Sequence, residues 1–295
     1  MSRLPIKFML RAGQAECELW PDFGGSIAHW SINGQNMFRT ASNDAANQPL
    51  PLNMASFPLV PYSNRIGFGR FEWDGLPIQL ELNFPPEAHA LHGTGWMAQW
   101  NVVSQSADAA VLCHNHKADK HWPWNFEAEQ HIQLTEYGLT IHMVARNLSD
   151  QAAPLAFGHH PYFDCHGATL TFGADTVWRT GKDGLPDYTE APLGNFDFTN
   201  GRPVDGHTLD NGYAGWDGHA NIRWGDRPLQ LYIRSDMHAA VVYIPNDKGY
   251  FCFEPVPHIN NALNLPAHSP SMPVIGPAAS FNSSIKFQAS ATRRT

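Results

Sequence analysis

Residues 126–147, FEAEQHIQLTEYGLTIHMVARN, place hydrophobic side chains at every second position on both sides of a short polar turn. Before the turn, apolar residues such as Phe126 and Ile132 alternate with polar ones, and the alternation resumes at Leu139 and runs to Ala145. A period of two is typical of a strand with one buried face, because successive side chains point to opposite faces of a sheet. The sequence therefore predicts a β-hairpin here.

The same kind of strand recurs along the whole chain. Further strands are predicted at Cys17–Trp20, Ser26–Ile32, Arg70–Trp73, Asn101–Ser104, Thr169–Phe172, Ile222–Trp224, Leu229–Ile233 and Ala239–Ile244. Turn pairs such as Asn33-Gly34 and Asp74-Gly75 separate several of them, and no amphipathic helix longer than two turns stands out. We therefore expect an all-β fold, a large antiparallel β-sandwich, in a single domain that spans residues 1–295.

Composition excludes several classes of partner. The chain of 295 residues is 43% hydrophobic, enough for a large core, and its net charge is −8. This acidic balance argues against nucleic acid and anionic membranes as partners. No stretch approaches the roughly 18 apolar residues of a membrane span, and residues 1–13 lack the apolar core of a signal peptide. We expect a cytoplasmic protein, and the sequence leaves its oligomeric state open.

The cysteines and histidines do not form a recognisable metal pattern. The four cysteines are widely separated, which suits free buried thiols in a reducing cytosol. Cys113, His114 and His116 form a small cluster among 16 histidines, but no second Cys-x-x-Cys or His-x-x-x-His segment accompanies it. We therefore expect no metal.

Residues 64–75, NRIGFGRFEWDG, join a polar pair to a glycine-flanked turn and a short strand. An arginine beside such a turn, here Arg65, can offer a planar fork of donors to a polyhydroxylated or anionic ligand. The alternative is that Arg65 forms an ordinary ion pair at the surface.

Glu254 follows the apolar run Tyr250–Phe253 and precedes Pro255, which is expected to end the strand. Partial desolvation there would raise the carboxyl pKa toward the range in which it acts as a base near neutral pH. The alternative is a carboxylate that faces water at the end of a strand.

His160 lies between His159 and Pro161, and the proline restricts the backbone of His160 to an extended conformation. An imidazole is the usual proton donor near neutral pH, although a hydrogen-bonded core histidine is the alternative. Adjacent residues of a strand point to opposite faces, so at most one of the two histidines can face a given pocket.

Two further segments mix aromatic and polar side chains in a way that suits a carbohydrate. Residues 91–96, LHGTGW, place His92 in a glycine-rich loop before a tryptophan. Residues 209–218 contain Asp210 and Trp216, and end in Asp217-Gly218, which is best explained as a hairpin turn.

Taken together and in this order, these segments resemble the aldose 1-epimerase (galactose mutarotase) family. The matching residues are Asn64, Arg65, Gly69, Arg70, Phe71, Asp74, Gly75, Leu91, His92, Gly93, His160, Tyr162, Phe163, Asp210 and Glu254. The resemblance covers almost the whole chain and implies the supersandwich fold of galactose mutarotases. It also implies an isomerase that interconverts the α and β anomers of a free sugar without metal or organic cofactor.

The resemblance implies roles for particular residues. Glu254 would be the general base that takes the proton from the C1 hydroxyl, and His160 the general acid that protonates the ring oxygen. We expect their side chains to converge about a sugar ring's width apart. The implied substrate-binding residues are Arg65, His92, Asp210, Asn64 and, as a wall of the pocket, Trp216.

The chain departs from the family pattern around the expected pocket. His89 stands where the family loop commonly has Asn, and Thr94 replaces its second Gly. Pro255 and Val256 follow the glutamate, where galactose-type members often carry a Gln two positions after it. The expected acid and base are kept, but positions that read individual hydroxyls differ, so the sugar is not identified.

Two alternatives remain on the same scaffold. A hexose-6-phosphate 1-epimerase would need two or more basic groups that converge on the phosphate, for which Arg65 and Arg70 are the candidates. A non-catalytic sugar-binding or sensor protein would keep the pocket without needing an acid–base pair.

Overall fold

The computed structural model describes residues 5–41, 50–266 and 271–292. The described part consists of β-strands and connecting loops, and its only helices are the short 3₁₀ turns η2 (Pro51–Asn53), η3 (Gly67–Gly69), η4 (Gly95–Met97), η5 (Gly194–Phe196) and η6 (Ala262–Asn264). None of these helices is long or apolar enough to span a membrane. The predicted all-β fold built from large antiparallel sheets is confirmed.

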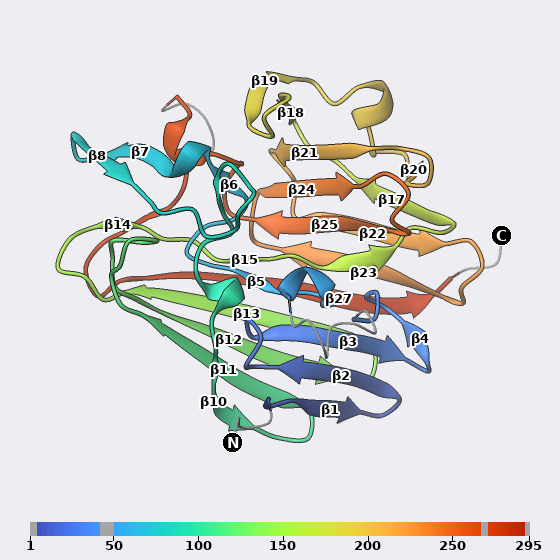
Figure 1. Cartoon of the computed structure of the whole chain (residues 1–295). Helices are drawn as coiled ribbons and strands as arrows, with labels where there is room; N and C mark the ends of the chain where they lie inside the picture. Colours follow the sequence, from blue (N-terminus) through green and yellow to red (C-terminus); the bar gives the residue numbers. More distant parts are fainter. Residues whose placement is uncertain (1–4, 42–49, 267–270, 293–295) are drawn as a thin grey trace.

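The largest sheet has nine strands (Figure 1). Their order is β10 (Asn101–Gln105), β11 (Ala109–His116), β12 (Phe126–Thr135), β13 (Gly138–Asn147), β27 (Ser280–Ala291), β23 (Leu229–Ser235), β22 (His219–Trp224), β17 (Ala168–Phe172) and β20 (Arg202–Pro203). The predicted hairpin forms β12 and β13, with Phe126 opposite Asn147 and Thr135 opposite Gly138. Its alternation is visible in the structure, since every second side chain of β12 from Phe126 to Leu134 is buried.

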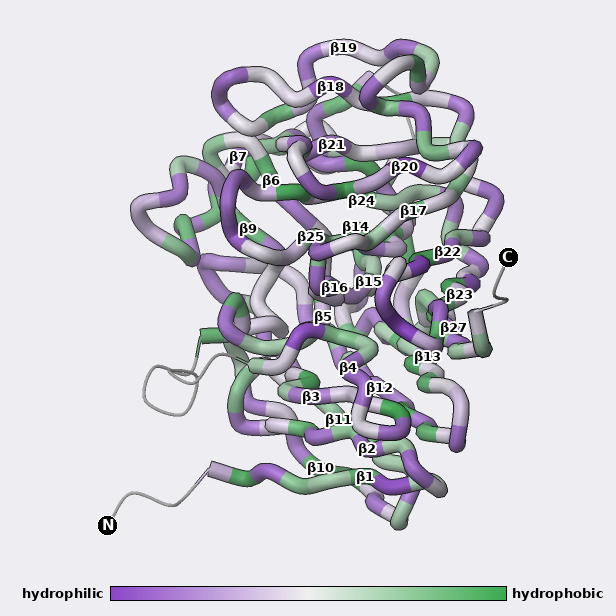
Figure 2. Tube along the Cα trace, turned by 90° about the vertical axis from the view of Figure 1, so that its right-hand side faces the viewer, coloured by the Kyte–Doolittle hydropathy of each residue, from purple (hydrophilic) through white to green (hydrophobic). Residues whose placement is uncertain are grey.

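A four-stranded sheet contacts the β10–β13 end of the large sheet. It consists of β1 (Phe8–Ala12), β2 (Ala15–Trp20), β3 (Ser26–Ile32) and β4 (Gln35–Asn36), and β1 and β2 both contact β12. The turn between β3 and β4 is formed by Asn33 and Gly34, which both have positive φ, as the Asn-Gly signal predicts. Figure 2 shows how hydrophilic and hydrophobic residues alternate over short distances along the chain.

A six-stranded sheet carries Asp210 and Glu254, two of the residues that the sequence singled out. Its order is β16 (Tyr162–Asp164), β25 (Tyr250–Val256), β24 (Ala239–Ile244), β21 (Leu209–Ala214), β18 (Thr176–Thr180) and β19 (Pro186–Glu190). One face packs on the large sheet, where Phe253 of β25 lies 5.0 Å from the ring of Phe172 of β17. The opposite face is therefore available for a ligand site.

Four short strand pairs complete the described fold. They are β5 (Pro58–Leu59) with β15 (Gly158–His159), β6 (Arg65–Ile66) with β9 (Ala90–Leu91), β7 (Arg70–Trp73) with β8 (Leu76–Gln79), and β14 (Ala153–Pro154) with β26 (Val274–Ile275). The pairing of β6 with β9 brings Arg65 opposite Leu91 and so places two of the segments singled out in the sequence side by side.

Two sequence expectations are corrected here. Pro255 does not end its strand, because β25 continues to Val256 and Pro255 pairs with Ala240. The neighbour on the other side, β16, pairs with β25 only over residues 250–252, so the missing amide hydrogen of Pro255 costs no bond to that strand. The cysteines are free thiols as expected, but Cys165 is only half-buried.

Candidate active site

A cavity of about 300 Å³ opens above the free face of the six-stranded sheet. It is lined by six of the seven residues that the sequence singled out for function, namely Asn64, Arg65, His92, His160, Asp210 and Glu254. These residues are up to 190 positions apart in the chain, counting from Asn64 to Glu254 (254 − 64). The fold therefore brings the separate motifs to one place.

The floor of the cavity follows from the period of two in the strands beneath it. In β25, Phe251 and Phe253 enter the main core, whereas Tyr250 and Glu254 point to the other face and line the cavity. In β24 and β21, Tyr243 and Asp210 lie directly opposite each other in register and line it as well. Alternation thus separates a core face from a polar, ligand-facing side.

The rim is formed by loops whose backbone conformation is unusual. Asn64 and His92 both have positive φ, 59° and 57°, in the left-handed region that most residues with a side chain avoid. Gly93 follows with a φ of 73°, and a side chain there would meet the carbonyl oxygen of Val60 at 2.4 Å. The Leu-His-Gly signal therefore marks a backbone that needs glycine to approach its neighbour closely.

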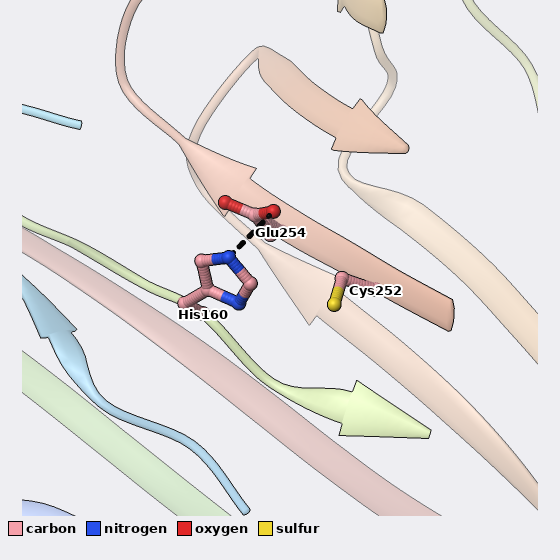
Figure 3. Close-up of side chains that lie close together, drawn as sticks. All are labelled: His160, Cys252 and Glu254. Carbon is pink, nitrogen blue, oxygen red and sulfur yellow. Dashed lines mark ion pairs between the residues drawn. The ribbon is translucent and has the colours of Figure 1, made fainter. Parts of the chain in front are cut away.

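His160 and Glu254 both line the cavity, and their side chains point toward each other (Figure 3). Nε2 of His160 lies 3.3 Å from Oε1 of Glu254, and the two residues are only 5% and 2% exposed. The expected separation of a sugar ring's width is wrong, because the two groups touch directly. A sugar would therefore contact both from the cavity side rather than lie between them.

The ring of His160 packs against two aromatic rings, which also contact each other at 6.1 Å between ring centres. Phe57 stacks on it at 4.6 Å between ring centres, and Tyr162 stacks on it at 4.6 Å. The main-chain amide of His160 donates to the carbonyl of Phe57. His159 is turned away and is hydrogen-bonded to Ser56 and Gln130 inside the protein. Only one of the adjacent histidines faces the cavity, as strand geometry requires.

Burial shifts the pKa values of the pair in opposite directions. Desolvation lowers the pKa of His160 well below 6.5, with further lowering by His92 and Arg39. Desolvation also raises the pKa of Glu254 well above 4.5, and Asp210 raises it further. Both shifts favour uncharged groups. The neutral pair and the ion pair hold the same number of protons, so the two forms differ only in which group carries one of them.

Oε2 of Glu254 and Nδ1 of His160 are buried and have no hydrogen-bond partner within the described residues. Unpaired buried polar atoms are costly, and they are expected where a ligand completes the bonding.

Arg65 lies between two carboxylates on the wall of the cavity. Its Nε is 3.5 Å from Oε2 of Glu87, and its Nη1 is 3.6 Å from Oδ2 of Asp210. Its Nη1 also donates to Oδ1 of Asn64. The guanidinium is thus held in one orientation, and burial raises the pKa of Asp210 although Arg65 opposes that shift.

His92 has a defined tautomer. The amide of Asn64 donates to its Nδ1 at 3.1 Å, so Nδ1 is the acceptor and a neutral ring carries its hydrogen on Nε2. Burial lowers the pKa of His92 to about 3, with a further contribution from Arg65. Near neutral pH His92 is therefore a hydrogen-bond donor toward the cavity, not a group that exchanges protons.

Trp216 does not line this cavity, and the expectation that it forms a wall is wrong. It is 1% exposed, packs edge-to-face on Phe253, and donates from Nε1 to the carbonyl of His219. Arg70 is also elsewhere, at the exposed strand pair β7–β8, where it bonds Gln79.

Sequence reasoning assigned no site role to eight residues that line the cavity. Four are aromatic, one is a carboxylate and three are aliphatic: Phe84, Tyr162, Tyr243, Tyr250, Glu87, Leu52, Leu91 and Val241. A signal for Tyr250 existed, because it lies four positions before Glu254 in one strand and so shares its face.

The described part contains two groups of three potential metal ligands, and within each group the ligand atoms lie within 4.8 Å of one another. The groups are His160, Cys252 and Glu254, and Asp164, Cys165 and His166. In the first, His160 and Glu254 contact each other, and burial raises the pKa of the Cys252 thiol well above 9.0. In the second, Asp164 is engaged by Arg227 and His166. A metal-bound cysteine must be a thiolate, and we assign a metal to neither group.

A family model described as aldose 1-epimerase matches residues 9–288 of the chain. The chain belongs to the aldose 1-epimerase family. This membership accounts for the shared order of the Asn-Arg, Leu-His-Gly, His160 and Glu254 segments, and it confirms the resemblance seen in the sequence.

Relatives of this aldose 1-epimerase family member agree with the fold. The uncharacterized protein YphB of Escherichia coli K12 is 32% identical over 213 residues, which cover 68% of this chain and 72% of YphB. A solved E. coli K12 structure provisionally named an aldose 1-epimerase has a TM-score of 0.90 at 25% identity, covering 97% of this chain and 99% of that one. A galactose mutarotase-like protein from Clostridium acetobutylicum has a TM-score of 0.87 at 20% identity, covering 97% and 95%, and shows the same fold.

Proposed function

We propose that this protein is an aldose 1-epimerase (mutarotase) that interconverts the α and β anomers of a free aldose by acid–base opening and closure of the sugar ring. The observation that carries the proposal is the buried contact of His160 with Glu254 at the floor of a cavity of about 300 Å³. A carbohydrate-binding site alone does not require two proton-transfer groups in contact.

The reaction needs one proton acceptor and one proton donor at the same C–O bond. In the ion-pair form, the carboxylate of Glu254 takes the proton of the C1 hydroxyl, and the imidazolium of His160 gives a proton to the ring oxygen. The O1–H electron pair forms the C=O bond of the aldehyde, and the C1–O5 electron pair passes to the ring oxygen. Rotation about C1–C2 and closure with the roles reversed gives the other anomer.

Ring opening converts the ion pair of His160 and Glu254 into the neutral pair. Because burial favours the uncharged form of each group, the environment assists this step. In ring closure, Glu254 gives its proton to O1, and His160 takes a proton from the hydroxyl at O5. The pair therefore finishes each cycle as it began, and no cofactor takes part in the proposed steps.

The remaining residues of the cavity would bind the sugar. The fixed guanidinium of Arg65 and the Nε2 hydrogen of His92 can donate to sugar oxygens, while the carboxylate of Asp210 can accept from hydroxyls. Asn64 would act mainly through its contacts with Arg65 and His92. Tyr162, Tyr243 and Tyr250 offer aromatic surface to the apolar faces of the ring.

The charge of the cavity speaks against the hexose-6-phosphate alternative. Among the described residues that line it, Arg65 is the only lysine or arginine, and it already contacts Glu87 and Asp210. A phosphate needs several converging donors that are not already neutralised. We therefore propose an uncharged aldose as substrate.

The proposal is tested by anomer-exchange NMR on a panel of neutral, acidic and phosphorylated aldoses. We expect acceleration for a neutral aldose, and a loss of about 10²- to 10⁴-fold in Glu254→Gln and in His160→Asn, because each removes one proton transfer. His219→Asn, at an exposed histidine, is the matched control and should keep full activity.

Sugar binding is measured in parallel by calorimetry. If both variants exchange anomers as fast as the wild type, the assignment of the two residues is wrong. If the wild type binds sugars but accelerates none, the sensor alternative is correct.

A further inference from the structure

Arg39 lies behind the catalytic site and is held there by its hydrogen bonds. Its Nε donates to the carbonyl of Met54 at 3.1 Å, and its Nη2 donates to Met54 at 3.0 Å and also to Leu52. Its main-chain amide donates to the carbonyl of Tyr162 at 2.8 Å. Within the described residues these partners are all uncharged, and no carboxylate forms an ion pair with this guanidinium. Arg39 is therefore a fixed and uncompensated positive charge.

This charge lies on the aromatic stack that holds His160. Cζ of Arg39 is 3.5 Å from the centre of the Tyr162 ring, and the ring of His160 stacks on Tyr162 at 4.6 Å. Arg39 and His160 therefore both contact the ring of Tyr162. Phe57 also stacks on the imidazole, at 4.6 Å, and its ring lies 6.1 Å from that of Tyr162, so the three rings form one cluster.

We propose that Arg39 is a positioning residue for the acid–base chemistry, in which its fixed guanidinium, packed on the same Tyr162 ring as His160, orients the imidazole of His160 and favours the neutral form of that ring. The catalytic meaning of this role rests on the proposed function, but the effect on His160 does not. Arg39 is absent from the cavity lining, so it acts on the sugar only through these rings.

The charged and titratable groups around His160 determine the direction of the effect. They are Glu254 and Cys252 on β25, His92 on the rim, His159 before it, Tyr162 on β16 and Arg39 on the ring of Tyr162. Glu254 alone favours a protonated imidazole when it is ionised. Arg39 is the one permanent cation in the group, and like charge opposes protonation.

The size of the effect follows from the distances. The two ring separations, 3.5 and 4.6 Å, place Arg39 no more than about 8 Å from the imidazole. A unit charge at that distance in a partly screened protein interior moves a titration midpoint by about one pH unit. A lower midpoint makes the imidazolium a stronger acid toward the ring oxygen of the sugar.

The test is the titration of His160 followed by NMR of a labelled imidazole in the full-length protein, with variants at Arg39. Arg39→Gln keeps hydrogen-bond donors for the carbonyls of Leu52 and Met54 but removes the charge, and we expect the His160 midpoint to rise by about one pH unit. Arg39→Lys keeps a charge that cannot lie flat on the ring. The His160 midpoint in this variant should therefore fall between those of the wild type and Arg39→Gln. Arg179→Gln removes another arginine stacked on a ring, that of Phe196, and should leave His160 unchanged.

Kinetics supply a second readout in the same proteins. We expect the acidic limb of the rate profile of Arg39→Gln to move upward with the midpoint, and kcat to fall while KM is kept, because Arg39 does not line the sugar cavity. A His160 midpoint within 0.2 units of the wild type (roughly the precision of such titrations) in folded Arg39→Gln would overturn the proposal.

If Arg39→Gln does not fold, the test rests on Arg39→Lys. A His160 midpoint above that of the wild type supports the role of the fixed guanidinium, and an unchanged midpoint overturns it. Failure of the proposed function is distinct, because a protein that exchanges no anomers would still show the His160 titration.

Discussion

Asn64 and His92 exchange hydrogen bonds across the rim of the cavity: the amide of Asn64 donates to Nδ1 of His92 at 3.1 Å, and the amide of His92 donates to the carbonyl of Asn64 at 2.8 Å. This exchange fixes both the position of the imidazole and the nitrogen that carries its hydrogen. The imidazole can then offer one N–H donor to a sugar without being able to supply a proton. In the proposed mechanism the two histidines therefore have separate tasks, His160 in proton transfer and His92 in binding.

Replacing His92 by Phe should weaken sugar binding without abolishing proton transfer. The substitution keeps an aromatic ring of similar shape but removes the Nε2 donor and leaves the amide of Asn64 without its acceptor. We expect kcat/KM to fall about tenfold to a hundredfold, the usual effect of one lost hydrogen bond to a polar ligand. Steady-state anomerisation at several sugar concentrations measures this. A drop confined to kcat would instead assign His92 to the chemical step.

Glu87 should control which charges the cavity accepts. In Glu87→Gln, Arg65 keeps Asp210 as its only carboxylate partner, so the wall becomes less negative by one charge. We expect activity on a 6-phosphorylated or uronic sugar to rise about tenfold relative to a neutral sugar, since one nearby charge is worth about 1.4 kcal/mol here. Competition between labelled sugars measures the ratio. Glu190→Gln, outside the cavity, serves as the control. An unchanged ratio in Glu87→Gln would mean that Glu87 does not determine the preference between charged and neutral sugars.

Stability should fall steeply as the pH is lowered below the ordinary range of histidine. Burial lowers the pKa values of His92 and His159 to about 3 and of His258 to about 4, from 6.5. Between these values the unfolded chain binds protons that the folded protein does not, so the free energy of unfolding decreases as the pH falls from about 6.5 toward 4. Each histidine adds at most about 1.4 kcal/mol per pH unit.

Urea unfolding at a series of pH values checks this slope. His159→Gln removes one titrating group and should reduce the slope by about 1.4 kcal/mol per pH unit. Glu254, whose pKa is raised by burial, acts in the opposite sense, so Glu254→Gln should make the slope steeper. A free energy of unfolding that does not change between pH 7 and 5 in Glu254→Gln would show that these histidines bind protons as readily in the folded protein as in the unfolded chain.

Trp216→Ala should destabilise the fold and leave sugar binding intact. The side chain is fully buried against Phe253, on the core face of the six-stranded sheet, so its loss creates a cavity worth about 3 to 5 kcal/mol. Chemical unfolding measures the loss, and kcat/KM of the folded fraction should be within twofold of the wild type (about the precision of such rates). A large increase in KM would mean that the core face and the cavity are coupled.

The strands were predictable because their signal is local. The alternation around Glu136 and Tyr137 needs no knowledge of distant residues, and β12 and β13 end where the pattern ends. The failure at Pro255 has a physical reason. A proline breaks a strand only when a neighbouring strand needs its amide hydrogen, and the sequence does not show that β16 stops before this point.

The members of the site were found through motifs, but their surroundings could not be. Whether Trp216 or Tyr243 faces the cavity depends on which face of the sheet is covered by another sheet, and both residues look alike as aromatic residues near strands. The cluster of Phe57, His160 and Tyr162 likewise depends on the pairing of β5 with β15. Direct contact of His160 with Glu254, rather than a sugar's width, is a matter of side-chain packing that no spacing in the sequence reports.

The left-handed backbone at Asn64 and His92 restricts how this site can diversify. A substitution at either position must tolerate positive φ as well as supply the right polar atom, and few residue types do both. Glu87 and Tyr243 carry no such restriction, because their backbones are not in that region. Changes of sugar preference among descendants of this protein should therefore accumulate at the walls, while the rim and the floor stay as they are.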